Sequence, residues 1–152
     1  MSTFDQYLTR VLETAAAEAK SDGSAAVEAH HLLLAIAGEG SLALQSAGLD
    51  QAAVRRALDQ EFSRSLAAAG VRLAGGMPDA TPDPEKSPPV GASVRAALER
   101  SFQLVERKRD MRPGHVLLGV LQAELGTVPR ALALAGIDRA DLCERALTEV
   151  RA

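Results

Sequence analysis

Two histidines occupy equivalent positions in a repeated motif, and they are the residues with the widest range of chemistry. Residues 31–36 read His-Leu-Leu-Leu-Ala-Ile, and residues 115–120 read His-Val-Leu-Leu-Gly-Val. An imidazole can act as a base or bind a metal, but a zinc site needs three or four converging ligands. Cys143 belongs to a different predicted helix, and the adjacent His30 points to another face than His31. We therefore interpret His31 and His115 as structural residues and predict no metal site.

The sequence contains no recognisable set of catalytic residues. A nucleophilic site needs a nucleophile, a base and an orienting group within reach, and no spacing indicates such a set. Cys143, between Leu142 and Glu144, is interpreted as a packing or surface residue. The chain has no phosphate-binding loop and no Gly-Lys pair, so nothing is available to cradle a triphosphate. We predict no catalytic residue, no cofactor and no enzyme activity.

Composition indicates a helical protein forming one domain over residues 1–152. The net charge is −3, and the basic cluster at residues 107–109 is flanked by acidic residues, which argues against nucleic-acid and membrane partners. A single cysteine excludes an intramolecular disulfide. No apolar run approaches the ~20 residues that span a membrane, and the N-terminus does not resemble a signal peptide. We expect a cytoplasmic protein.

The first half of the chain predicts four helices. Thr3 and Gln6 form a candidate capping box for the first helix, whose apolar residues recur at helical spacing. A second, nearly all-apolar helix is expected near residues 27–37, and a short third one near 41–47 with Gly48 after its end. Asp50 is expected to cap the fourth helix, whose predicted buried stripe consists of Val54, Ala57, Leu58 and Phe62.

The second half repeats this order. The fifth helix is expected to bury Val94, Ala97, Leu98, Ser101, Phe102 and Val105. Pro113 is suited to the first turn of a sixth helix, Gly136 ends a seventh, and Asp138 caps an eighth. Five of the seven prolines lie in residues 70–90, which we expect to form an extended linker. The predicted fold is all-α: two four-helix repeats, residues 3–69 and 91–151, related by a pseudo-twofold axis.

The repeated pattern resembles the Clp N-terminal repeat domain of the Hsp100 unfoldases. The pattern is an amphipathic helix, then His-hydrophobic-Leu-Leu-small-hydrophobic, then a short helix ending Ala-Gly-hydrophobic-Asp at residues 47–50 and 135–138. The resemblance runs from Phe4 to Val150 and is greatest to the ClpC type. The ATPase modules are missing, so the chain is either a stand-alone member or an excised domain.

This resemblance implies a non-enzymatic module of the ClpC-type quality-control system, binding substrates, adaptors or peptide ligands, including cyclic peptides. A Clp unfoldase or protease is then an expected partner. The implied site is a groove between the first helices of the two repeats. Its matching positions are Phe4, Arg10, Leu12, Val90, Arg95, Leu98 and Glu99, and the aromatic Tyr7 lies nearby. Val90 departs from the family, whose members carry an aromatic residue there.

The sequence leaves open the role of Phe4 and two alternatives for the function. Phe4 is either an exposed anchor for a ligand or a staple that holds the helix start against the core. A free-standing domain of this kind could act as a decoy that sequesters cyclic peptide antibiotics directed at ClpC. The other alternative for the function is a purely structural or oligomerising helical protein. An exposed leucine-rich face on the fourth or eighth helix would favour it.

Overall fold

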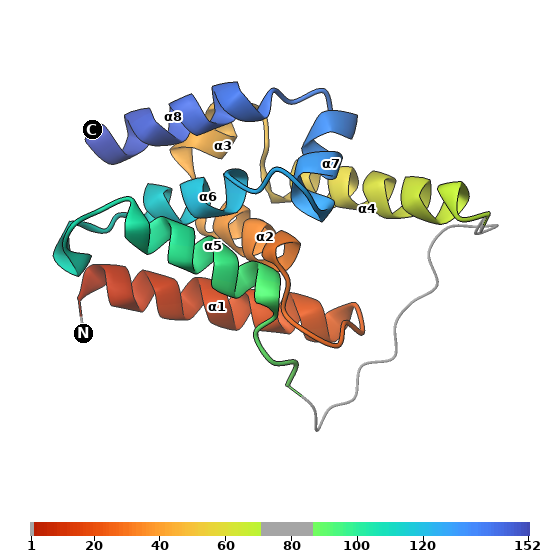
Figure 1. Cartoon of the computed structure of the whole chain (residues 1–152), viewed down its shortest axis with the longest axis horizontal. Helices are drawn as coiled ribbons and strands as arrows, with labels where there is room; N and C mark the ends of the chain where they lie inside the picture. Colours follow the sequence, from red (N-terminus) through yellow and green to blue (C-terminus); the bar gives the residue numbers. More distant parts are fainter. Residues whose placement is uncertain (1, 71–86) are drawn as a thin grey trace.

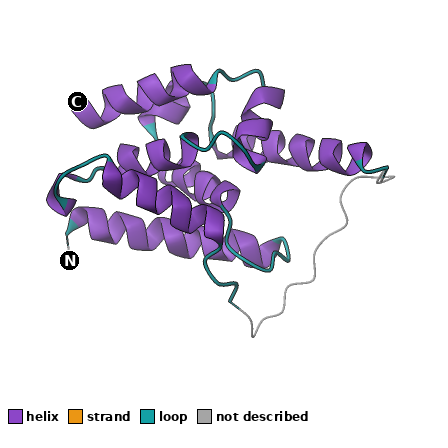
Figure 2. Cartoon of the chain, in the orientation of Figure 1, coloured by secondary structure: helices purple, strands orange, loops and turns teal. Residues whose placement is uncertain are grey.

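The computed structural model describes residues 2–70 and 87–152, and this part of the chain is helical (Figures 1 and 2). Eight α-helices follow one another within it, with a single 3₁₀ turn, η1, at Lys108–Asp110. Their bounds are α1 Thr3–Ser21, α2 Ala29–Glu39, α3 Leu42–Ser46, α4 Gln51–Ala68, α5 Ala92–Gln103, α6 Pro113–Leu121, α7 Thr127–Leu134 and α8 Arg139–Arg151. The predicted all-α class and helix order are confirmed. Residues 71–86, most of the predicted linker, lie outside the described residues, and the proposed repeat boundaries stay predictions.

Capping residues account for where several helices begin. Asp50 and Asp138 accept hydrogen bonds from the first turns of α4 and α8, as the sequence predicted. The prediction for α1 was displaced by one residue: Ser2, not Thr3, is the N-cap, and its hydroxyl accepts from the Asp5 N–H. The Asp5 carboxylate accepts from Ser2 in return, which completes a capping box that Gln6 does not join.

The central layer consists of α2 and α6, the two helices that carry the repeated histidine motif (Figure 1). Leu32, Leu33 and Ile36 on α2 are almost completely buried, as are Leu117, Leu118 and Leu121 on α6. Helix α1 packs on α2 just as α5 packs on α6, and α4 packs on α2 just as α8 packs on α6. These matched pairs are the pseudo-twofold arrangement that the repeat predicted.

The third and fourth helices are exchanged between the repeats. Helix α4 of the first repeat packs on α7 of the second, and α8 of the second packs on α3 of the first. A pair of equivalent glutamates makes the polar contacts. Glu61 on α4 accepts a 2.8 Å bond from Arg130 on α7, and Glu149 on α8 accepts from the Leu42 N–H at the start of α3, also at 2.8 Å. The two repeats therefore complete each other's cores.

Two predicted stripes differ from the structure in detail. On α4 the buried residues are Val54, Ala57, Leu58 and Glu61, while Phe62 is 44% exposed. Glu61 turns inward because Arg130 and Ser65 satisfy its carboxylate. Helix α5 ends at Gln103, so Val105 lies in the following loop and Phe102, at the helix end, is 37% exposed.

Acid should weaken the contact between α4 and α7 through Glu61. Burial raises the pKa of Glu61, but the Ser65 hydroxyl and the Arg130 guanidinium outweigh it and hold the pKa below its usual 4.5. A lowered pKa adds stability above pH 4.5 that is lost as pH falls through the folded-state value. We expect Glu61→Gln to lower the free energy of unfolding by about 1–2 kcal/mol at pH 7. Urea titrations at pH 7 and pH 3 should show this gap closing in acid, and a gap that stays constant would contradict the assignment.

Candidate functional site

Both repeated histidines cap their own helices. The Nδ1 atom of His31 accepts a 2.9 Å hydrogen bond from the Glu28 N–H, and the Nδ1 atom of His115 accepts one of the same length from the Arg112 N–H. Each imidazole thus satisfies a backbone donor that the first turn of an α-helix leaves without a partner. The structural interpretation of both histidines is confirmed.

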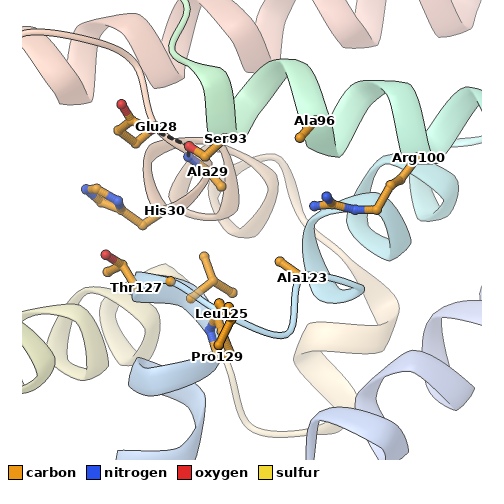
Figure 3. Close-up of a pocket in the computed structure, with 12 residues that line it drawn as sticks. Glu28, Ala29, His30, Ser93, Ala96, Arg100, Ala123, Leu125, Thr127 and Pro129 are labelled. Carbon is orange, nitrogen blue, oxygen red and sulfur yellow. Dashed lines mark hydrogen bonds between the residues drawn. The ribbon is translucent and has the colours of Figure 1, made fainter.

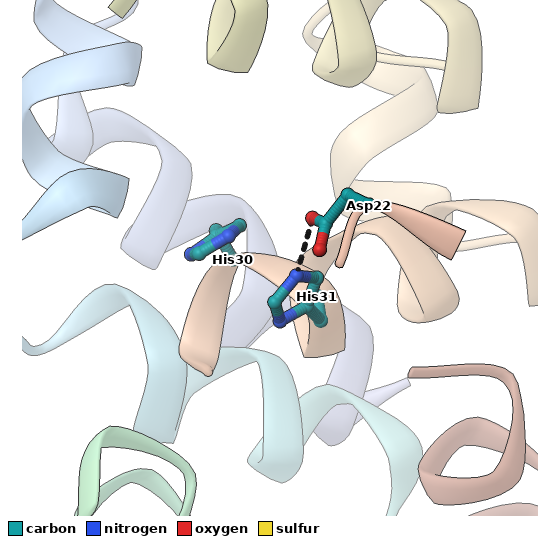
Figure 4. Close-up of side chains that lie close together, drawn as sticks. All are labelled: Asp22, His30 and His31. Carbon is teal, nitrogen blue, oxygen red and sulfur yellow. Dashed lines mark hydrogen bonds and ion pairs between the residues drawn. The ribbon is translucent and has the colours of Figure 1, made fainter. Parts of the chain in front are cut away.

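The Asp22, His30 and His31 side chains form a cluster whose potential ligand atoms lie within 4.8 Å of one another (Figure 4). The tautomer of His31 argues against a metal there. Because Nδ1 accepts a hydrogen bond, the neutral ring carries its proton on Nε2, and this N–H donates to Asp22 at 2.7 Å. A metal bound at Nε2 would move that proton to Nδ1. The Nδ1–H and the Glu28 N–H would then be two donors facing each other. The cluster is better explained as a buried histidine held at both nitrogens.

The same geometry argues against a catalytic triad with Ser24. The Ser24 hydroxyl lies 3.4 Å from His31 Nε2 and donates to Asp22, so serine and aspartate meet the same nitrogen. In a triad, the acid orients one ring nitrogen while the other accepts the proton of the nucleophile. Here no ring nitrogen is left to act as a base.

The residues predicted for the groove lie on α1, on α5 and just before α5. Phe4 and Tyr7 are buried, at 9% and 7% exposure, and Phe4 packs edge-on against Phe102 with ring centroids 6.4 Å apart. Of the two roles considered for Phe4, the structure supports the second: the buried ring holds the start of α1 against the end of α5. Leu12 and Leu98 are half-buried.

The polar and exposed members of this predicted set are placed as follows. Arg10 forms an ion pair with Glu39 at 2.8 Å, and Arg95 donates to the Val90 carbonyl. Glu99 is exposed, and Val90 is 40% exposed. The main chain around Val90 is fixed, because the Val27 N–H donates to the Pro89 carbonyl and the Gly91 N–H donates to the Val27 carbonyl, both at 2.8 Å.

A pocket of about 410 Å³ lies elsewhere, where both repeats meet (Figure 3). The start of α2, one face of α5, the α6–α7 loop and the first turn of α7 enclose it. Sequence reasoning missed this pocket, because small residues scattered over four segments form it. The one signal of this pocket in the sequence was Leu125, a leucine in the loop segment Ala123-Glu124-Leu125-Gly126.

Comparison with known proteins shows the family and the fold of this chain. The sequence pattern of the Clp repeat (R) N-terminal domain matches residues 3–108. The chain belongs to the Clp N-terminal repeat domain family. A crystal structure of the N-terminal domain of the caseinolytic protease associated chaperone ClpD from Arabidopsis thaliana has the same fold, with a TM-score of 0.66. That match is 22% identical in sequence and covers 96% of this chain and 93% of the other. None of the curated proteins matches the chain.

Clp N-terminal repeat domains are protein-interaction modules rather than catalysts, and they bind substrates and adaptors of Clp unfoldases. Within residues 2–70 and 87–152, no helix is long and apolar enough to cross a membrane.

Proposed function

We propose that this Clp N-terminal repeat domain binds extended protein segments through a surface formed by α1, α5 and the residue just before α5, and that it does so for a ClpC-type unfoldase. We call this surface the α1/α5 face. Its members are Leu12, Val90, Arg95, Leu98, Glu99 and Phe102. A partly exposed apolar surface with charged residues at its edge is the usual anatomy of a protein-binding site.

The observation that carries the proposal is the exposure of apolar side chains at both ends of α5. Val90 precedes the helix and is 40% exposed, and Phe102 near its end is 37% exposed. Leu98 lies between them, half-buried. Side chains of this kind, held on a rigid helix, can contact a ligand at little cost in conformational entropy.

Val90→Asp should test the face without disturbing the fold. The hydrogen bonds that fix the main chain here join Val27 to Pro89 and Gly91 and do not involve the Val90 side chain, whereas Phe4→Ala would remove a buried ring. We expect the affinity for fluorescein-labelled unfolded casein to fall about tenfold, corresponding to 1.4 kcal/mol, because the carboxylate replaces an apolar contact. Fluorescence anisotropy would measure it.

Leu134→Asp is the matched control, because Leu134 is 38% exposed on α7, which packs on α4. This variant should bind casein like the wild type. Equal affinities of the wild type and both variants would reject the α1/α5 face. Light scattering adds a second check: a stable dimer that masks the face would favour the oligomerising alternative.

A further inference from the structure

The pocket between the repeats is lined mainly by small and apolar side chains (Figure 3). Leu125 stands at its rim and is 89% exposed. The other apolar members are Ala29, Ala96, Ala123, Val128 and Pro129. With about 410 Å³, the pocket has the size of sites that bind small ligands or single residues.

Two groups give this pocket a positive character. The Arg100 Nε atom donates to the Gly119 carbonyl at 2.9 Å, while the Nη atoms have no acceptor among the described residues. In Figure 3 the guanidinium points from α5 into the space above Ala123. An arginine held at Nε with its other donors free is prepared to bind an anion.

The second group is the start of α7. Its N-cap is Gly126, which has no side chain to accept a hydrogen bond, and the third helical residue is Pro129. Within the described part of the chain, the N–H groups of Thr127 and Val128 make no hydrogen bond. Free N–H groups at a helix N-terminus attract negative charge.

The remaining polar groups do not cancel this character. The Glu28 carboxylate lies at the end of the pocket away from Arg100, where it accepts a hydrogen bond from the Ser93 hydroxyl (Figure 3). Burial, helped by the neighbouring His31, lowers the pKa of His30 to about 4, so His30 is neutral at pH 7. An anion is therefore favoured beside Arg100, and an apolar group is favoured beside the alanines.

We propose that this pocket binds the C-terminal residue of a polypeptide that ends in an aliphatic side chain. The terminal carboxylate binds the Nη atoms of Arg100, the start of α7 adds to the positive character of the pocket, and the side chain rests on Ala96 and Ala123. A C-terminal leucine carries its carboxylate and its aliphatic side chain on one Cα atom, which matches the short reach of the pocket. An internal aspartate offers the charge without the apolar group. The site is separate from the α1/α5 face.

A pair of synthetic peptides tests this assignment. Both are fluorescein-labelled decapeptides ending in Ala-Leu, one with a free carboxylate and the other amidated. We expect the wild type to bind the free acid at least tenfold more tightly than the amide. Arg100→Gln should abolish this preference, and Arg56→Gln, on an exposed arginine of α4, should leave it unchanged.

Arg100 also holds the Gly119 carbonyl, so a second pair of variants protects the test against a folding defect. Ala123→Glu places a carboxylate in the pocket and should remove the preference by repulsion, while Ala123→Gln, of the same size, should keep it. Val90→Asp should also keep it, which separates this site from the α1/α5 face. Circular dichroism verifies the fold of each variant.

Three outcomes would overturn the proposal. The free acid and the amide could bind the wild type equally or not at all. The preference could survive in both Arg100→Gln and Ala123→Glu. An amidated peptide with an internal aspartate could compete as well as the free acid, which would show recognition of acidic side chains instead of chain ends.

Discussion

Gly119→Ala is expected to destabilise the domain by on the order of 3 kcal/mol, although alanine is the better helix former. A Cβ atom at position 119 would lie 2.0 Å from Ser101 Oγ and 2.2 Å from the Ala97 carbonyl oxygen. The serine side chain can rotate, but the carbonyl belongs to the backbone of α5. Helix α5 would therefore have to move away from α6, in an interior packed too closely to absorb the shift. Urea denaturation followed by circular dichroism measures the loss.

Gly38→Ala provides the matched control, since Gly38 is also a helical glycine. The added Cβ atom would meet the end of the Gln51 side chain, which can rotate away. We expect a change within about 0.5 kcal/mol, typical of surface substitutions. Similar destabilisation by both alanines would mean that the close approach of α5 and α6 is not what requires glycine at position 119.

His31→Ala is expected to cost about 4 kcal/mol, in the range measured for deleting large buried side chains. His31 is fully buried, and its removal leaves a cavity. It also leaves the Glu28 N–H without its acceptor and Asp22 without the Nε2 donor. A buried donor without a partner adds to the cost of the lost packing.

The equivalent histidine of the second repeat is an internal comparison for this prediction. His115 makes the same Nδ1 cap but is only half-buried. We expect His115→Ala to cost about 1 kcal/mol, the usual value of a helix cap. The free energies of unfolding of both variants, measured in urea, should differ accordingly. Equal losses would show that capping alone, without burial or the Asp22 contact, sets the role of His31.

The order of the helices could be predicted because it depends on local signals. Asp50 and Asp138 mark helix starts in any context, and the histidine motif is apolar on every face, which requires burial. The contacts across the fold are different. Nothing near Glu61 in sequence indicates Arg130, its partner 69 residues later, and so Phe62 was assigned to the buried stripe instead. Asp22 was likewise missed as the partner of His31, because a loop brings it back over α2.

The predicted binding residues show the same limit. The resemblance places Phe4 at a groove, with Tyr7 nearby, but exposure depends on what packs over these side chains, and Phe102 covers Phe4. The pocket beside Arg100 left only one signal in the sequence, a leucine in the α6–α7 loop. It depends on the distance between α5 and the α6–α7 loop, and no periodic pattern in one segment encodes that distance.

The exchange of terminal helices between the repeats has a consequence for how the chain matures on the ribosome. When α4 emerges, the helix that covers Glu61 has not been made, because α7 begins only at Thr127. In the same way, α3 is completed only by α8, whose Glu149 accepts the hydrogen bond from the Leu42 N–H. The first half therefore carries open apolar surface until α7 and α8 have been made, and the domain acquires its native state in a single step after that rather than one repeat at a time.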